Sequence, residues 1–152
     1  KKLPNSKVVA IDISESALDI ANQNAEINSL QDRIEFRRFD IMNDNLNSLG
    51  MFDLIVSNPP YVSENDYESL EPELKNHEPK IALTDNSNGI SFYKHIIEVS
   101  NQILYKTGKI YFELGVDQSA QVQEYFEQNN FTNIIITKDY SGIDRIIRGE
   151  LR

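Results

Sequence analysis

Short runs rich in valine and isoleucine alternate along this chain with longer segments whose apolar residues recur at helical spacing. Apolar runs of about four to eight residues are typical of buried strands, and a period of about 3.6 residues is typical of helices that bury one face. Alternation of the two favours an α/β fold built around a mostly parallel sheet. No other feature of the sequence constrains the fold as strongly.

The expected elements can be placed by residue number. Ser14 is suited to cap a helix, with Leu18, Ala21 and Ala25 on its buried face. Two further helices are expected over residues 91–105 and 117–128, and strands over residues 7–13, 33–39, 52–57, 109–114, 131–138 and 145–148.

Two segments without a strong period are also informative. Residues 62–88 contain scattered acids, two prolines and a polar turn, and we expect them to form a long loop over the strand ends. The last two strands are separated by residues 139–144, which is short enough for an antiparallel hairpin. The expected fold is therefore Rossmann-like, with a mostly parallel sheet that ends in an antiparallel hairpin.

Composition limits the partners that the chain can have. Its 152 residues carry a formal net charge of -9, which repels a phosphate backbone, so no direct contact with nucleic acid is expected. The absence of cysteine excludes disulfides and thiolate chemistry. No apolar run approaches the roughly 20 residues that cross a bilayer. We expect a cytoplasmic protein without a membrane partner.

In sheets of this kind, ligands bind outside the carboxyl ends of the strands. Asp12 follows the first expected strand, where its carboxylate can accept hydrogen bonds from the ribose hydroxyls of a nucleoside cofactor. An acid at a helix start can also simply favour the helix dipole, and dehydrogenases have an acid in a similar place, so NAD remains open at this position.

Asp40 and Ile41 follow the next strand. The carboxylate can bind the amino group of adenine while the isoleucine covers the ring, or Asp40 can be an ordinary surface acid that starts a loop. Glu113 also ends a strand, and no role is assigned to it.

The most specific motif is Asn58-Pro59-Pro60-Tyr61, which follows an apolar strand directly. An amide or exocyclic amine is a weak nucleophile, so its catalyst has to position and polarise the nitrogen. The Asn58 side-chain carbonyl and the Pro59 backbone carbonyl can each accept one hydrogen of an NH2 group, and Tyr61 can stack on its plane. Pro59 and Pro60 fix φ and remove N–H donors, which holds the carbonyls in one orientation.

This motif resembles the signature of amino-methyltransferases that act on planar nitrogen, including glutamine-N5 and adenine-N6 enzymes. Three more segments resemble the HemK/PrmC family of release factor glutamine methyltransferases, and the likeness runs from Val8 to Gly149. The three segments are residues 77–83, residues 85–89 with Phe92-Tyr93, and residues 139–145.

The resemblance implies a class I methyltransferase that uses S-adenosylmethionine to methylate the glutamine of a release-factor Gly-Gly-Gln loop. Carried over by position, the cofactor contacts are Asp12, Ile13, Asp40, Ile41 and Asn58, and the glutamine is held by Asn58, Pro59, Pro60 and Tyr61. No metal is expected, because His77 and His95 lie far apart without spaced ligand partners.

One part of the family pattern is missing. The first strand of the fold is normally followed by a Gly-rich loop that the cofactor approaches closely, but this sequence has no glycine before Gly50. We therefore expect that the first strand and the Gly-rich loop of the fold are both absent, and that residues 1–152 are a single catalytic domain truncated at its amino end, with weakened cofactor binding.

The sequence alone leaves three alternative functions open. An adenine-N6 methyltransferase acting on DNA or RNA would use the same motif but should carry a basic groove. A non-catalytic fragment of the fold would explain the missing glycines. An NAD-dependent dehydrogenase would explain Asp12 but not the Asn-Pro-Pro-Tyr motif.

Overall fold

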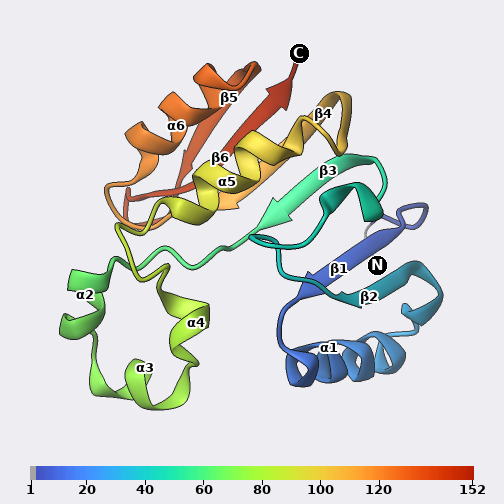
Figure 1. Ribbon diagram of the computed structural model, residues 1–152, viewed down its shortest axis with the longest axis horizontal. Helices are drawn as coiled ribbons and strands as arrows, with labels where there is room; N and C mark the ends of the chain where they lie inside the picture. The colour runs from blue at the N-terminus through green and yellow to red at the C-terminus, as the bar shows by residue number, and fades with distance from the viewer. Residues whose placement is uncertain (1–2) are drawn as a thin grey trace. The chain divides into compact units, whose positions relative to one another are not determined.

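The computed structural model describes residues 3–152. They form two compact units, residues 3–49 and Gly50–Arg152. Each unit has its own sheet (Figure 1). No helix in this described part of the chain is long and apolar enough to span a bilayer.

The first unit is a strand–helix–strand unit. Its two parallel strands are β1 (Val8–Asp12) and β2 (Ile34–Arg38), joined by α1 (Glu15–Ile27) and a 3-10 turn at Gln31–Arg33. A second 3-10 turn, Leu46–Ser48, follows β2. The Ser14 side chain accepts a hydrogen bond from the Ala17 backbone N–H at 3.2 Å, which confirms it as the cap of α1.

The second unit has a four-stranded sheet in the order β3-β4-β6-β5. The strands are β3 (Phe52–Ser57), β4 (Leu104–Glu113), β5 (Phe131–Lys138) and β6 (Asp144–Leu151). β3 and β4 are parallel, whereas β6 is antiparallel to both β4 and β5. The expected terminal hairpin is confirmed, and β6 rather than β5 lies beside β4.

Two helices, α5 (Ser91–Ser100) and α6 (Ser119–Gln128), pack on this sheet. Their core is a chain of rings in which Tyr93 meets Phe112 at 5.2 Å, Phe112 meets Phe126 at 5.8 Å, and Phe126 meets Phe131 at 5.0 Å between ring centroids. The β6 strand accommodates the Phe126 ring because Gly149 has no side chain, and a Cβ there would lie 2.8 Å from it.

The expected loop over residues 62–88 is wrong in part. It contains three short helices, α2 (Glu64–Ser69), α3 (Pro72–His77) and α4 (Lys80–Leu83). Local chemistry explains the first two, because Ser63 caps α2 through the Asp66 N–H at 3.1 Å and Pro72 stands in the first turn of α3.

The expected boundary between the 91–105 helix and the following strand is also wrong. The helix ends at Ser100, and β4 begins at Leu104 rather than at residue 109. Thr107 and Gly108, a residue pair typical of a turn, lie inside β4, where Thr107 has a φ of 66°. The pairing register between β3 and β4 shifts there, so the irregularity is absorbed by the sheet.

The helical spacing of Phe92, Ile96, Val99 and Ile103 predicts one buried face for that helix, and the structure differs in part. Tyr93, Ile96, Ile97 and Ser100 are buried in α5, whereas Phe92 and Val99 are only half-buried.

Of the residues expected on the buried face of α1, Ala25 is buried, whereas Leu18 and Ala21 are half-buried. The spacing of Val122, Tyr125 and Phe126 predicts the packing face of α6, where Val122 and Phe126 are buried and Tyr125 is half-buried.

Candidate active site

The Asn58-Pro59-Pro60-Tyr61 motif lies at the carboxyl end of β3, as the sequence predicts. Pro59 is buried and Asn58 is exposed. Among the described residues the Asn58 side chain has no hydrogen-bond partner, and neither does the Pro59 carbonyl. Both acceptors are therefore available to a ligand.

Tyr61 is fixed by a side chain from far along the sequence. The Gln118 amide nitrogen donates to the Tyr61 carbonyl at 2.8 Å and to the Gly89 carbonyl at 3.3 Å. The Gln118 amide oxygen accepts from the Gly115 N–H at 3.2 Å. One side chain thus connects three loop segments at the end of the sheet.

Two glycines make room for Tyr61. Gly89 has a φ of +78°, and a Cβ there would collide with the Tyr61 carbonyl oxygen. A Cβ on Gly115 would lie 2.9 Å from the Tyr61 ring. Both positions therefore require glycine, because any side chain would push the motif out of place.

Asp85 shapes the loop that carries Gly89. Its carboxylate accepts hydrogen bonds from the backbone N–H groups of Ser87 and Gly89, each at 2.9 Å, and of Ser91 at 3.0 Å. Burial opposes ionisation of this carboxyl, but the hydrogen bonds from Ser91, Gly89 and Ser87 outweigh it and lower the pKa of Asp85.

Glu113, to which the sequence assigned no role, lies next to the motif. The Tyr61 hydroxyl donates to the Glu113 carboxylate in a weak hydrogen bond of 3.5 Å. The hydroxyl of Tyr93 donates to the Glu113 backbone carbonyl at 2.8 Å. Burial raises the pKa of the Tyr61 phenol, and the neighbouring Glu113 charge raises it further, so this phenol stays protonated.

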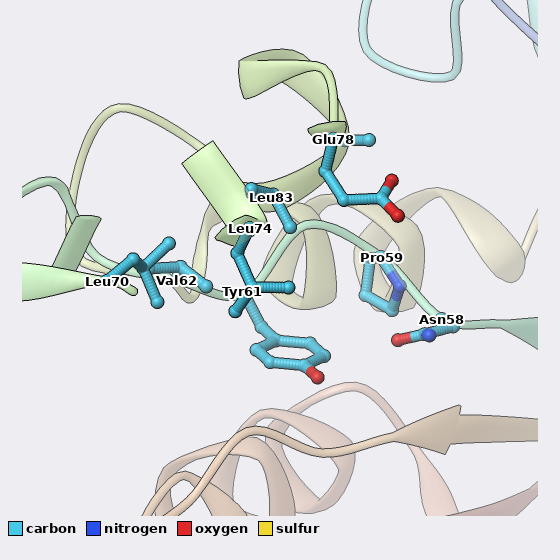
Figure 2. Close-up of a pocket in the computed structure, with 9 residues that line it drawn as sticks. Asn58, Pro59, Tyr61, Val62, Leu70, Leu74, Glu78 and Leu83 are labelled. Carbon is cyan, nitrogen blue, oxygen red and sulfur yellow. The ribbon is translucent and has the colours of Figure 1, made fainter. Parts of the chain in front are cut away.

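A pocket of about 380 Å³ opens beside the motif (Figure 2). Asn58, Pro59 and Tyr61 form part of its wall. The remaining lining comes from the segment with three short helices, namely Val62, Leu70, Leu74, Glu78, Ala82 and Leu83. The sequence did not indicate Leu70, Leu74 and Leu83 as site residues, because residue spacing in such short helices does not show which face of each helix lines a pocket.

The candidate cofactor residues lie in the first unit. The Phe39 N–H donates to the Asp12 carbonyl at 2.9 Å, so Asp12 and Asp40 stand at neighbouring ends of parallel strands, as expected. The Asp12 Oδ1 accepts from the Ser14 N–H at 2.8 Å, which leaves Oδ2 without a partner among the described residues.

Asp40 is engaged within its own loop. Its Oδ1 accepts from the Met42 N–H at 2.9 Å and its Oδ2 from the Asn43 side-chain amide at 2.8 Å. Nearby, Ile13 is exposed and Ile41 is half-buried. Carboxylate oxygens at adjacent strand ends with apolar side chains beside them suit a sugar joined to a flat ring, which fits a nucleoside cofactor.

Residues 139–145 carry part of the family resemblance and lie in the terminal hairpin. Arg145 donates to the Leu114 carbonyl at 3.1 Å and to Asp139 at 3.4 Å, whereas Asp144 pairs with Lys138 at 2.7 Å. Asp144 and Arg145 are adjacent in the sequence but pair with different residues, and residues 139–145 brace the hairpin. Over residues 3–152, no three His, Asp or Glu side chains are grouped so that they could hold a metal ion.

Comparison with solved structures defines the class. A methyltransferase from Pyrococcus furiosus superposes with a TM-score of 0.67 at 18% identity, over 96% of this chain and 63% of that one. The human METTL16 catalytic domain, in complex with a MAT2A 3'UTR hairpin, gives a TM-score of 0.71 at 17% identity, over 99% and 57% of the two chains. The chain has the fold of the class I S-adenosylmethionine-dependent methyltransferases.

Sequence comparison narrows the class. Residues 1–74 match a family described as the methyltransferase small domain. The release factor glutamine methyltransferase of Fusobacterium nucleatum is 41% identical over 146 residues, covering 96% of this chain and 41% of that protein. That of Enterococcus faecalis is 39% identical over 148 residues, covering 97% and 52%.

The sequence relatives of this chain are thus release factor glutamine methyltransferases, and the resemblance to the HemK/PrmC family indicated by the motifs is confirmed. The chain spans about half the length of these relatives, or less.

Proposed function

We propose that this chain is the catalytic part of a methyltransferase that transfers a methyl group from S-adenosylmethionine to the side-chain amide nitrogen of a glutamine. The substrate implied by the resemblance is the Gly-Gly-Gln loop of peptide chain release factors. The observation that carries the proposal is the pair of unpartnered acceptors, the Asn58 side chain and the Pro59 carbonyl, at the end of β3 beside an open pocket.

These acceptors suit a primary amide. The Asn58 Oδ1 and the Pro59 carbonyl each take one N–H of the glutamine side chain, which fixes its nitrogen in one orientation. The Tyr61 ring stacks on the plane of the amide, and Gln118 holds the backbone of Tyr61 in place. S-adenosylmethionine, when bound, supplies an electrophilic methyl group. With the cofactor bound, the amide nitrogen would form a bond to the methyl carbon as the bond from that carbon to sulfur breaks, S-adenosylhomocysteine would leave, and one N–H proton would pass to water, so no strong base is required.

We assign the cofactor to Asp12, Ile13, Asp40 and Ile41, with Asn58 as a further contact. The free Oδ2 of Asp12 is the acceptor for the ribose hydroxyls. Asp40 and Ile41 bind the adenine in this assignment. The Asp40 carboxylate accepts a hydrogen bond from the adenine amino group, and the Ile41 side chain covers the ring. We also place the protein in the cytoplasm, where its proposed substrate acts.

Charge favours a protein substrate over the adenine of a nucleic acid. Residues 62–84 carry Glu64, Asp66, Glu68, Glu71, Glu73 and Glu78 against Lys75 and Lys80. A surface of this sign next to the motif repels phosphate and attracts a basic peptide.

Mass spectrometry of peptides tests the proposal. A Gly-Gly-Gln peptide is incubated with S-adenosylmethionine and the chain, beside a Gly-Gly-Asn peptide and an adenine-containing oligonucleotide. One added methyl on glutamine, absent with Asn58→Ala, supports the proposed reaction. Methylation of the oligonucleotide alone would replace it with the adenine-N6 activity. No methyl on any substrate, with S-adenosylmethionine shown to bind, would favour a non-catalytic role.

A further inference from the structure

The segment that follows the motif is fixed at both of its ends. Residues 62–84, which we call the helical lobe, contain α2, α3 and α4. The Val62 N–H donates to the Leu83 carbonyl at 2.9 Å, and Val62 pairs with Thr84 in a parallel bridge. The Glu64 N–H donates to the Ser87 carbonyl at 2.9 Å. The lobe is therefore closed at its base, directly beside Tyr61.

The lobe presents aliphatic side chains to the pocket. Val62, Leu70, Leu74 and Leu83 line it opposite Asn58 and Pro59 (Figure 2). Leu74 is 42% exposed although it lies in a helix with a polar exterior. Aliphatic side chains that line an open pocket next to a reactive motif are characteristic of a binding site rather than of a core.

Glu78 adds an unneutralised charge to this wall. Its carboxylate has no ion pair or hydrogen bond with another residue of the described part of the chain. The two lysines of the lobe are engaged with Tyr67, since the Lys75 and Lys80 ammonium groups lie 5.4 Å and 5.0 Å from its ring centroid. Lys75 also lies 3.5 Å from Glu68. Figure 2 shows the Glu78 carboxylate on the side of the pocket where Pro59 and Asn58 lie.

We propose that this pocket is a peptide subsite that recognises residues flanking the methylated glutamine. An aliphatic side chain of the substrate enters among Leu70, Leu74 and Leu83, and a basic side chain next to it pairs with Glu78. This inference rests on the proposed function, because it places the glutamine at the Asn58 motif. It adds that the lobe, and not only the motif, selects the substrate.

Labelled peptides of one length provide the test. In each, Gly-Gly-Asn replaces Gly-Gly-Gln, so that binding is measured by fluorescence polarisation without methyl transfer. The peptides differ only in two residues that flank Gly-Gly-Asn. These are leucine and arginine in the first peptide, serine and arginine in the second, and leucine and aspartate in the third. The leucine–arginine peptide should bind about tenfold more tightly than the serine–arginine peptide, which corresponds to burying one aliphatic side chain.

Two variants of the same lobe separate the subsite from a general effect. Leu74→Asp should remove the preference for leucine over serine. Ile81→Asp should preserve it, because Ile81 is 57% exposed in α4 and is not part of the pocket lining. Glu78→Gln should remove the preference for arginine over aspartate while keeping that for leucine. All three side chains are solvent-accessible, so these substitutions should not unfold the chain.

Specific results would overturn the subsite. One is equal affinity for the leucine and serine peptides. Another is an equal loss of the preference for leucine in Leu74→Asp and Ile81→Asp. A third is binding of an adenine oligonucleotide to the chain that Leu74→Asp abolishes. Methylation of glutamine without any flanking preference would refute the subsite alone. A flanking preference without methylation would refute the proposed reaction and keep the subsite.

Discussion

The side-chain amide of Gln118 donates a hydrogen bond of 2.8 Å to the backbone carbonyl of Tyr61, a residue 57 positions earlier in the chain. The bond connects the residue before α6 to the loop that follows β3. The motif of this chain is thus held in place by a residue that carries no recognisable signature of its own.

Replacing Gln118 by alanine removes this connection. We expect a loss of stability of about 1 to 3 kcal/mol from its broken hydrogen bonds, and a fall in methyl transfer of about tenfold because Tyr61 loses its fixed position. The control is Gln123→Ala within α6, since the side chain of Gln123 donates to Glu127 at the surface and has no other side-chain partner among the described residues. Thermal unfolding and turnover measure both effects, and equal behaviour of the two variants would contradict the role of Gln118.

Asn58→Ala tests the acceptor itself. Asn58 is exposed and unbonded to other described residues, so the variant should unfold at the temperature of the parent chain and bind S-adenosylmethionine nearly as well. Methyl transfer should fall by about 100-fold or more, because the amide loses an acceptor that orients it. Turnover at an unchanged rate would show that Asn58 does not hold the substrate.

Gly89 and Gly142 form a matched pair. Both have a positive φ, +78° and +81°, but a Cβ on Gly89 would collide with the Tyr61 carbonyl whereas a Cβ on Gly142 would meet nothing within 4 Å. Alanine at Gly142 should cost about 1 to 2 kcal/mol from backbone strain alone. Alanine at Gly89 should cost about 1 to 3 kcal/mol more. Equal melting temperatures for the two variants would mean that Tyr61 moves aside without cost.

Asp85 should make stability depend on pH in the acid range. Its pKa is lower in the folded chain than the ordinary value of 3.8, so its contribution is present above that value and is lost as the pH falls towards the lower folded pKa. Asp85→Asn should therefore be less stable than the parent chain at neutral pH, and the difference should shrink on acidification. Thermal unfolding between neutral and acid pH measures this, and a constant difference would exclude the carboxylate as the cause.

Cofactor affinity is the fifth expectation. No glycine precedes Gly50, so the first unit has no glycine at which a bound cofactor could approach the backbone closely. We expect weak binding of S-adenosylmethionine in calorimetry, weakened further in Asp12→Ala because the ribose acceptor is lost. Tight binding by the unmodified chain would show that such an approach is not required.

Local signals in the sequence were sufficient for much of the fold. The bounds expected for β3 and β5 agree with the structure, and so does Ser14 as the cap of α1. The Asn58-Pro59-Pro60-Tyr61 motif was likewise evident from its residue types and from its position after an apolar strand. Apolar period, capping and proline effects depend on neighbours in the chain, so the sequence alone carries them.

Only the tertiary structure decided how the motif is supported and what faces it. The Gln118–Tyr61 hydrogen bond, the place of β6 beside β4 and the aliphatic wall from Leu70 to Leu83 all join residues that are distant in sequence or depend on how short helices turn. Such contacts arise from packing, in which each side chain is placed by neighbours from several segments at once. The sequence determined the fold class and the motif, while the packing determined the pocket that the motif serves.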